Sequence, residues 1–293
     1  MKDFLYRGFI KNFNIRFAYA HTTKLSNDLV KAHNACPLVS HILSRAATAG
    51  VLCSPTLGEE ERYSFTVTYP GPIGKIIIDA GAGADVRATA SSKQLMGTVQ
   101  EEQEIYGDTG SVNFMKVDTR RMINNGTCEA PLMDVVGDIC YYFSVSEQLE
   151  TDMYIAVGFN PDPETPVDIC QGILLQAMPD CDYEAMERLR KALHSPEFKA
   201  LAGKSPEVDN NFEILIKELL KGEETQPDYE VYGAHDPLFK CNCSREKTKS
   251  ILKTLGESDV EDIVAQNESV FISCQFCSKR YEFTPAEVVE AVK

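Results

Sequence analysis

The sequence predicts an α+β protein in three parts: a mixed N-terminal core of sheet and helices, a helical linker, and a small C-terminal domain. At 293 residues the chain exceeds the usual size of one compact core. Strand-type and helix-type patterns alternate over residues 1–180, and charged, helix-forming sequence fills residues 181–233. Two close cysteine pairs mark residues 234–293 as a separate unit.

The first helical pattern lies between residues 20 and 57. Apolar residues recur there at helical spacing in two runs, one containing Leu25 and Leu29 and the other Leu38 and Ile42. Pro37 separates the runs, so two helices are expected.

Strand-type patterns follow. Residues 63–69 alternate with a period of two, and residues 75–79 come after a turn rich in glycine and proline. The stretch 76–90 places glycines behind an apolar strand, which is also a feature of dinucleotide-binding loops. Only Gly81 and Gly83 are present, and β-type alternation resumes directly after them, so we expect a hairpin and no phosphate loop.

The rest of the N-terminal part predicts more strands and one helix. Strands are expected at residues 111–117, 153–159 and 172–178, with a helix at 135–148. Enough strands are present for a sizeable sheet, which supports the α+β class.

After Pro179 two helices are expected, at residues 183–194 and 209–221. The second helix has an apolar face made of Phe212, Leu215, Ile216, Leu219 and Leu220. Packing against the core accounts for such a face. A sharper hypothesis is conditional burial, in which the face is uncovered on a signal. Residues 222–237, rich in Glu, Asp, Pro and Gly, then lead into the C-terminal unit.

Composition limits the possible partners and compartment. The formal net charge of −15 argues against nucleic acid, because duplex binding needs clustered Lys and Arg. No N-terminal run has the length of a signal peptide, and no window approaches the roughly twenty apolar residues of a membrane span. We therefore expect a cytoplasmic protein without a membrane partner. In that reducing compartment, clustered cysteines bind metal or perform redox chemistry.

The C-terminal unit carries Cys241 and Cys243, and 31 positions later Cys274 and Cys277. Two close pairs separated by a short folded segment suit a tetrahedral metal, since each pair supplies two sulfurs from one turn. One zinc ion per chain is expected. An iron–sulfur centre uses the same ligands and stays an alternative. His235 is a competing ligand, but four thiolates already complete the coordination.

Local signals around the cysteines predict a compact fold. Ser244 precedes a helical run that ends at Gly256, residues 258–261 and 284–287 have capping-box spacing, and short strands are expected beside the Cys274 turn. Such a small unit buries little apolar surface. Metal binding, with an apparent free energy of roughly 10–16 kcal/mol in zinc peptides, would therefore dominate its stability.

The four cysteines also predict redox sensitivity. Thiolates are the oxidisable form of cysteine, and each of the four has a close partner for a disulfide. A Cys-X-X-Cys ring closes more easily than the tighter Cys-X-Cys ring. The first disulfide is therefore expected between Cys274 and Cys277.

Several stretches of the chain resemble the heat-shock protein 33 (Hsp33) family of redox-regulated chaperones. The resemblance rests on residues 241–247, on the spacing to Cys274 and Cys277 with the following residues 281–283, and on residues 142–148, 172–179 and 74–87. It spans most of the chain from about Gly74 onward and is weaker before that. Two positions depart from the family pattern, where Ala88 and Gln171 replace glycines expected to shape local turns.

This resemblance implies an ATP-independent holdase that is not an enzyme. The zinc-bound form would be inactive. Oxidation would form disulfides among the four cysteines, release zinc and unfold the linker. The Phe212–Leu220 face would then help an active homodimer to hold unfolding client proteins.

Two other classes of function stay open from the residues. In the first, the zinc unit is a permanent structural ribbon that docks a partner. In the second, Cys274 and Cys277 form a thiol–disulfide oxidoreductase site, although such sites normally begin a helix and the flanks here predict strands. Six further cysteines are expected to be core thiols, with extra redox sensing as the alternative: Cys36, Cys53, Cys128, Cys140, Cys170 and Cys181.

Overall fold

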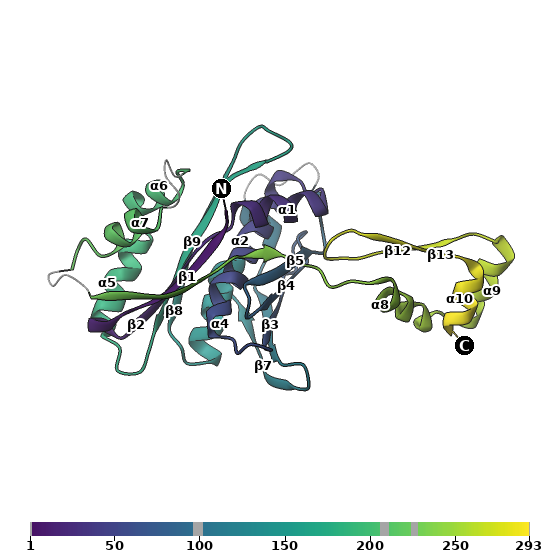
Figure 1. Ribbon diagram of the computed structural model, residues 1–293, viewed down its shortest axis with the longest axis horizontal. Coiled ribbons are helices and arrows are strands. Elements are labelled where there is room, and N and C mark those ends of the chain that lie inside the picture. The colour runs from purple at the N-terminus through teal and green to yellow at the C-terminus, as the bar shows by residue number, and fades with distance from the viewer. Residues whose placement is uncertain (1, 96–101, 206–210, 224–227, 293) are drawn as a thin grey trace. The chain divides into compact units, whose positions relative to one another are not determined.

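The computed structural model describes residues 2–95, 102–205, 211–223 and 228–292. The chain divides into two compact units, Met1–Phe239 and Lys240–Lys293, which we call unit 1 and unit 2. Unit 1 combines two sheets with helices and unit 2 combines one small sheet with helices, which confirms the predicted α+β class (Figure 1). Within the described residues, no helix combines the length and the apolar character needed to cross a membrane.

The first sheet of unit 1 has five strands, and every neighbouring pair is antiparallel. Their spatial order is β10 (Tyr229–His235), β1 (Phe4–Ile10), β2 (Ile15–His21), β9 (Val167–Ala177) and β8 (Thr151–Phe159). The edge strand β10 comes from the segment that precedes unit 2. The sheet therefore joins the two ends of unit 1.

The second sheet has six strands, antiparallel except where β11 pairs with β5. Their order is β11 (Leu238–Phe239), β5 (Asp85–Ala90), β4 (Lys75–Gly81), β3 (Arg62–Thr68), β6 (Gly110–Val117) and β7 (Met122–Ala130). Strands β4 and β5 pair in register from Ile76 opposite Ala90. The predicted hairpin is thus confirmed, and Gly81 and Gly83 lie at its turn.

Helices fill the space between the two sheets (Figure 1). They are α1 (Thr23–His33), α2 (Pro37–Cys53) and α4 (Val135–Ser146), with the short α3 (Glu102–Tyr106) nearby in sequence. Helix α2 is buried on almost every side and packs against strands of both sheets. A Cβ at Gly50 would lie 2.8 Å from Ile78, so glycine lets α2 approach β4 closely.

Three helices cover the opposite face of the first sheet: α5 (Tyr183–Leu193), α6 (Pro196–Ala202) and α7 (Phe212–Leu219). Asp182 and Ser195 cap the first two by accepting hydrogen bonds from main-chain N–H groups. Helix α7 is shorter than the helix expected at residues 209–221. Residues 209 and 210 lie outside the described residues, and Leu220 forms the C-cap.

Unit 2 is built around the hairpin β12 (Val270–Ser273) and β13 (Arg280–Phe283), which confirms the two short strands expected there. Around it lie α8 (Arg245–Lys249), the 3-10 turn η3 (Ser250–Thr254), α9 (Glu257–Gln266) and α10 (Pro285–Val292). The capping box expected at residues 258–261 is wrong. The helix begins earlier, with Gly256 as N-cap and its N–H donating to Asp259.

Two further expectations need correction. Ala88 and Gln171 shape no turn, because both are buried inside strands β5 and β9. Gln171 instead accepts a hydrogen bond from Tyr19 and donates one to the carbonyl of Ala202, which ties α6 to the sheet. The sequence patterns also did not indicate β1, β2, β7, β10, β11 or α6.

Candidate metal centre

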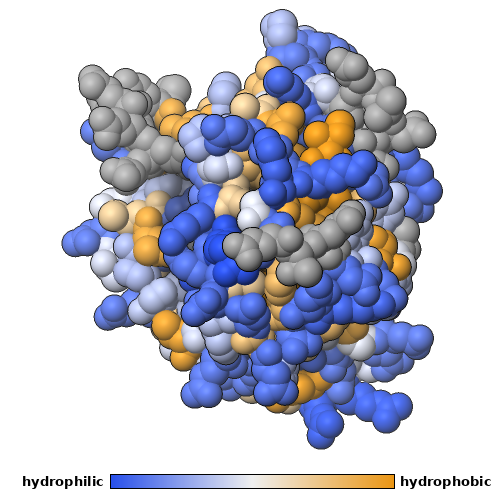
Figure 2. Space-filling view, turned by 90° about the vertical axis from the view of Figure 1, so that its left-hand side faces the viewer, coloured by the Kyte–Doolittle hydropathy of each residue, from blue (hydrophilic) through white to orange (hydrophobic). Residues whose placement is uncertain are grey.

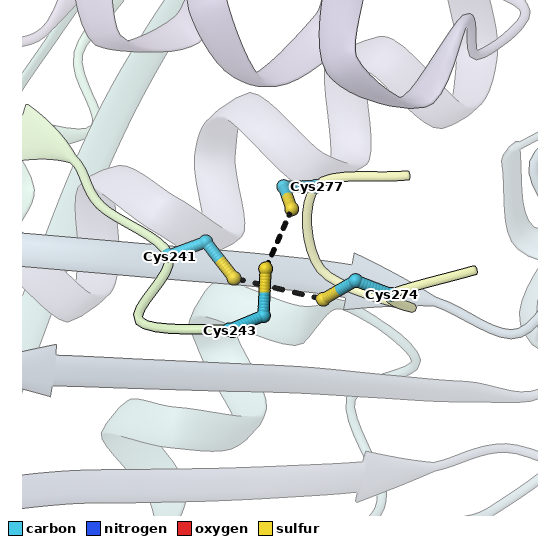
Figure 3. A group of neighbouring side chains, drawn as sticks. All are labelled: Cys241, Cys243, Cys274 and Cys277. Atoms are coloured by element: carbon cyan, nitrogen blue, oxygen red, sulfur yellow. Dashed lines mark hydrogen bonds between the residues drawn. The ribbon is translucent and has the colours of Figure 1, made fainter. Parts of the chain in front are cut away.

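The four C-terminal cysteines converge at one point of unit 2 (Figure 3). Cys241 and Cys243 lie in the segment before α8, and Cys274 and Cys277 lie in the turn between β12 and β13. All four Sγ atoms are within 4.8 Å of one another, and each cysteine is half-buried. The structure therefore brings together the residues that the spacing indicated.

The distances between the sulfurs fit a tetrahedral metal. Cys241 Sγ lies 3.6 Å from Cys274 Sγ, and Cys243 Sγ lies 3.5 Å from Cys277 Sγ. With zinc–sulfur bonds of about 2.3 Å, a regular tetrahedron has sulfur–sulfur edges of about 3.8 Å. All four thiols are free, so each sulfur is available as a ligand. Four thiolates are also the donor set of a closed structural zinc site.

The turn that carries Cys274 and Cys277 is held by its own main chain. Cys274 N–H donates to the carbonyl of Lys279 at 2.9 Å, and Ser278 N–H donates to the carbonyl of Cys274 at 2.8 Å. This closure requires a left-handed backbone at Ser278, where φ is +58°. The sequence between two paired strands thus folds both thiols to the same side.

The other cysteine pair is fixed by the start of α8. Ser244 is the N-cap, and its hydroxyl accepts a hydrogen bond from Lys247 N–H at 3.2 Å. The Lys247 ammonium donates to the carbonyl of Asn242, between the two thiols, at 2.9 Å. Side chain and helix cap together set the direction of the Cys-X-Cys segment.

One residue that sequence reasoning missed contacts the sulfurs directly. The Tyr281 hydroxyl donates a hydrogen bond to Cys243 Sγ at 3.1 Å. Burial acts to raise the pKa of Cys243, but hydrogen bonds from Tyr281 and the other thiols outweigh it and lower the pKa to about 7. Burial raises the pKa of Cys241 and Cys277.

Beneath the cluster, the buried core of unit 2 is small: Leu252, Tyr281, Phe283, Val288 and Ala291. A helix capping box and an arginine that stacks on an aromatic ring support this core. Thr284 and Glu287 form the predicted capping box of α10, with Thr284 N–H donating to the Glu287 carboxylate at 2.9 Å. The Arg245 guanidinium stacks on Phe283 and pairs with Glu287 at 2.7 Å. A core this small leaves much of the stability of unit 2 to the cysteine cluster.

The apolar face of α7 is covered in this structure. Phe212, Leu215, Ile216, Leu219 and Leu220 are all buried, against β1, β2 and the neighbouring helices. Phe212 packs against the rings of Tyr6, Phe17 and Tyr19. The side of the molecule where α5 to α7 lie is mainly hydrophilic, and apolar residues show there only in separate patches (Figure 2).

The six remaining cysteines lie apart from the cluster, in unit 1. Cys53, Cys140, Cys170 and Cys181 are buried, and Cys36 and Cys128 are half-buried. Burial raises the pKa of Cys53 to about 12 and also raises the pKa values of Cys140 and Cys170. Cys53, Cys140 and Cys170 are therefore protonated and poorly reactive at neutral pH.

Two other sequence hypotheses can be placed. His235 lies in β10, opposite Leu5, in unit 1 and outside the unit that carries the four cysteines. Cys274 and Cys277 occupy a β-hairpin turn and do not begin a helix, unlike the dithiol sites of thioredoxin-like enzymes.

Comparison with known proteins extends over the whole chain. The family model described as "Hsp33 protein" matches residues 3–284. The 33 kDa chaperonin of Bacillus mycoides (strain KBAB4) is 30% identical over 301 aligned residues, covering 100% of this chain and 99% of the relative. The 33 kDa chaperonin of Bacillus cytotoxicus is 30% identical over 304 residues, with the same coverage.

A solved structure shows the same fold. The crystal structure of the 33 kDa chaperonin (heat shock protein 33 homolog) of Thermotoga maritima superposes with a TM-score of 0.82. It covers 100% of this chain and 98% of that chain at 21% sequence identity.

Proposed function

The chain belongs to the Hsp33 family, a family of chaperones and not of enzymes, and we propose that it is a redox-regulated, ATP-independent holdase. The observation that carries this proposal is the four-cysteine cluster, whose sulfurs have the spacing of a tetrahedral zinc site. The proposed ligands of one zinc ion are Cys241, Cys243, Cys274 and Cys277. Zinc, when bound, supplies four metal–sulfur bonds that cross-link the two cysteine pairs.

In the proposed switch, an oxidant such as hydrogen peroxide takes two electrons from each cysteine pair. Two thiolates join as a disulfide, and the peroxide, with two protons, becomes two molecules of water. Cys274 and Cys277 form the first disulfide, followed by Cys241 and Cys243. Disulfide sulfurs no longer hold a divalent metal, so unit 2 loses its cross-link and unfolds.

The second part of the proposal concerns the surface that binds clients. The face of α7 is apolar and fully covered, as conditional burial requires. Unfolding of unit 2 removes the anchor at the end of the segment containing α7 and β10, and α7 then leaves the sheet. Residues 1–180 act as the client-binding core, 181–233 as the releasable linker and 234–293 as the switch. The active form is a cytoplasmic homodimer that binds unfolding proteins.

The test measures zinc release and client protection in one experiment. Reduced, zinc-loaded full-length protein is treated with peroxide at mildly raised temperature. A chelating dye reports zinc, and light scattering reports aggregation of a heat-unfolded client enzyme. We expect both signals to change with the same time course. Zinc release without client protection would contradict the proposal, and zinc retention under peroxide would favour a permanent structural site.

Two variants sharpen this test. Cys277→Ser removes one ligand, so the variant is expected to bind zinc weakly and to protect the client without peroxide. Cys36→Ser is the matched control, because Cys36 is also half-buried but lies in unit 1. It is expected to keep the wild-type response.

A further inference from the structure

The edge strand β10 is weakly held in unit 1. Among its side chains that the structure describes, none is buried, and Val231 and Tyr232 are 42% and 52% exposed. Its neighbour β1 differs, since Leu5 and Ile10 are 1% and 0% exposed. Strand β10 therefore stays in place mainly through main-chain pairing, which any extended chain can provide.

The contacts along the rim of β10 are electrostatic and exposed. Lys11 pairs with Asp228 and Glu230, and Lys2 pairs with Asp236. The pairing with β1 is also irregular, with a register shift between Tyr6 and Gly8. Exposed ion pairs add little stability. These pairs therefore contribute charge complementarity between the two strands and little free energy of association. The β1 side of the rim is basic and the β10 side is acidic.

A cavity of about 350 Å³ lies beside this edge, on the face of the sheet opposite α7. Apolar side chains, including Phe9, Leu52 and Leu174, make up most of its wall, and Tyr232 of β10 lines it. Its volume is at the lower end of the range for ligand pockets.

Two arginines of this wall are free of carboxylate partners among the described residues. Arg7 donates to the carbonyl of Pro55 at 3.4 Å, and the half-buried Arg16 donates to the Gln176 side chain at 2.7 Å. A guanidinium in an apolar wall attracts carboxylates and aromatic rings. The cavity thus has the chemistry to accept an acidic or aromatic side chain from a strand on the β1 edge.

Strand β10 already provides the aromatic part of this chemistry, because Tyr232 lines the cavity, while its Glu230 pairs with Lys11. Its first residues, Tyr-Glu-Val-Tyr, alternate between the two faces of the sheet: Tyr229 packs on Phe17 and Phe212, while Glu230 lies opposite Phe9 on the cavity side. Strand β10 thus occupies, from within the same chain, a sheet edge that could otherwise pair with a peptide.

We propose that the β1 edge, once β10 has left it, is the docking site of an extended client segment rich in aromatic and acidic residues. The segment pairs with β1 as a new strand. One set of alternate side chains enters the cavity lined by Arg7 and Arg16. The other set packs on the apolar face of the sheet from which α7 has departed. This inference rests on the proposed holdase function and specifies how the client is recognised.

A proline substitution opens the edge without oxidation. Lys11 N–H donates to the carbonyl of Asp228, and paired bonds recur at every second residue of an antiparallel ladder. Glu230, opposite Phe9, therefore directs its N–H toward β1, whereas Val231 directs its N–H to solvent. Glu230→Pro breaks the ladder. Val231→Pro is the matched control, since an edge strand tolerates proline at an outward N–H. Glu230→Ala controls for the lost charge.

The probe is a fluorescein-labelled peptide with the sequence of residues 228–236, and the readout is fluorescence anisotropy with reduced, zinc-loaded full-length protein. Glu230→Pro is expected to bind the peptide at least ~10-fold more tightly than wild type, because β10 no longer occupies the site. Val231→Pro and Glu230→Ala are expected to bind like wild type. Adding Arg7→Gln to Glu230→Pro is expected to weaken binding, and a scrambled peptide is expected to bind poorly.

Amide hydrogen exchange supplies the structural readout. Peptide binding to Glu230→Pro is expected to protect the N–H groups of Phe9 and Lys11 from exchange. Peptide binding to peroxide-oxidised wild type is expected to protect the same N–H groups. Equal binding of the native and scrambled peptides, or unprotected β1 amides, would overturn the inference. Dimerisation of Glu230→Pro that excludes the peptide would also overturn it. If oxidised wild type protects a client enzyme while the β1 amides exchange freely, the holdase function stands and only this docking mode fails.

Discussion

Unit 1 and unit 2 are stabilised by different means. Unit 1 has two extensive buried clusters, one between its sheets and one beneath α5 to α7. Unit 2 has one buried cluster of five apolar residues and a cluster of four thiols. Its charges are nearly balanced, with eight Lys and Arg against nine Asp and Glu in residues 240–293, so repulsion does not decide its stability. In the proposed switch, the unit that depends on oxidisable sulfur unfolds while strands β3 to β6 of unit 1 stay folded.

Removing the metal should give the largest difference between the units. A strong zinc chelator under reducing conditions is expected to unfold unit 2, because metal binding contributes on the order of 10 kcal/mol in comparable sites. Strands β3 to β6 of unit 1 should stay folded. Limited proteolysis with mass spectrometry would locate the cleavages, which are expected in residues 240–293, in α7 and in β10. Cleavage within β3 to β6 at the same rate would show that the units are not independent.

Weakening the contact between α7 and the sheet should have the next largest effect. Ile216 is fully buried, so Ile216→Ala is expected to destabilise this packing by ~2–5 kcal/mol. The reduced variant should then suppress client aggregation without peroxide while retaining zinc. Ile214→Ala is the matched control, because Ile214 lies on the same helix with 47% exposure. Equal behaviour of the two variants would show that burial of the α7 face does not restrain activity.

A smaller effect is expected at the hydrogen bond to Cys243. Tyr281→Phe removes the hydroxyl that donates to Cys243 Sγ and keeps the packed ring. The zinc-bound site should lose about 0.5–1.5 kcal/mol of stability. This loss should appear as faster zinc transfer to a competing chelator. Tyr232→Phe, in unit 1, controls for loss of a tyrosine hydroxyl. Unchanged zinc transfer in Tyr281→Phe would show that the hydrogen bond does not contribute.

The smallest effect is expected at Ser278, whose backbone is left-handed in the turn between β12 and β13. Ser278→Gly relieves this strain and should stabilise unit 2 by about 0.5–1 kcal/mol. In a chelator titration monitored by circular dichroism, unit 2 should reach half-unfolding at a higher chelator concentration than in the wild type. Ser273→Gly, in the adjacent strand, is expected to be neutral or destabilising. An earlier midpoint for Ser278→Gly would contradict the assigned strain.

Strong sequence periodicity was a reliable guide to the elements of unit 1. Helices α1 and α2 and strands β3 to β5 form where the spacing of apolar residues indicated them. Strand β2 was missed because helices and sheet bury it on both faces, so it lacks the alternation of a half-buried strand. Strand β10 was missed for the opposite reason. It buries no described side chain and is specified by its pairing with β1.

Cysteine spacing was enough to indicate the four-cysteine cluster, because each close pair places two thiols in one turn and only the meeting of the two turns depends on the fold. Tyr281 was not indicated as a partner of Cys243, because that contact depends on strand register, with Tyr281 opposite Ile272. The covered state of the α7 face could be stated only as a hypothesis, because an amphipathic pattern does not specify what packs against it.

Amide hydrogen exchange of the full-length protein, before and after peroxide, tests the central claim most directly. After zinc loss, we predict that protection disappears in residues 240–293, in α7 and in β10, while β3 to β6 stay protected. Loss of protection confined to residues 240–293, with α7 and β10 unchanged, would contradict the claim that the sulfur cluster keeps the apolar face covered.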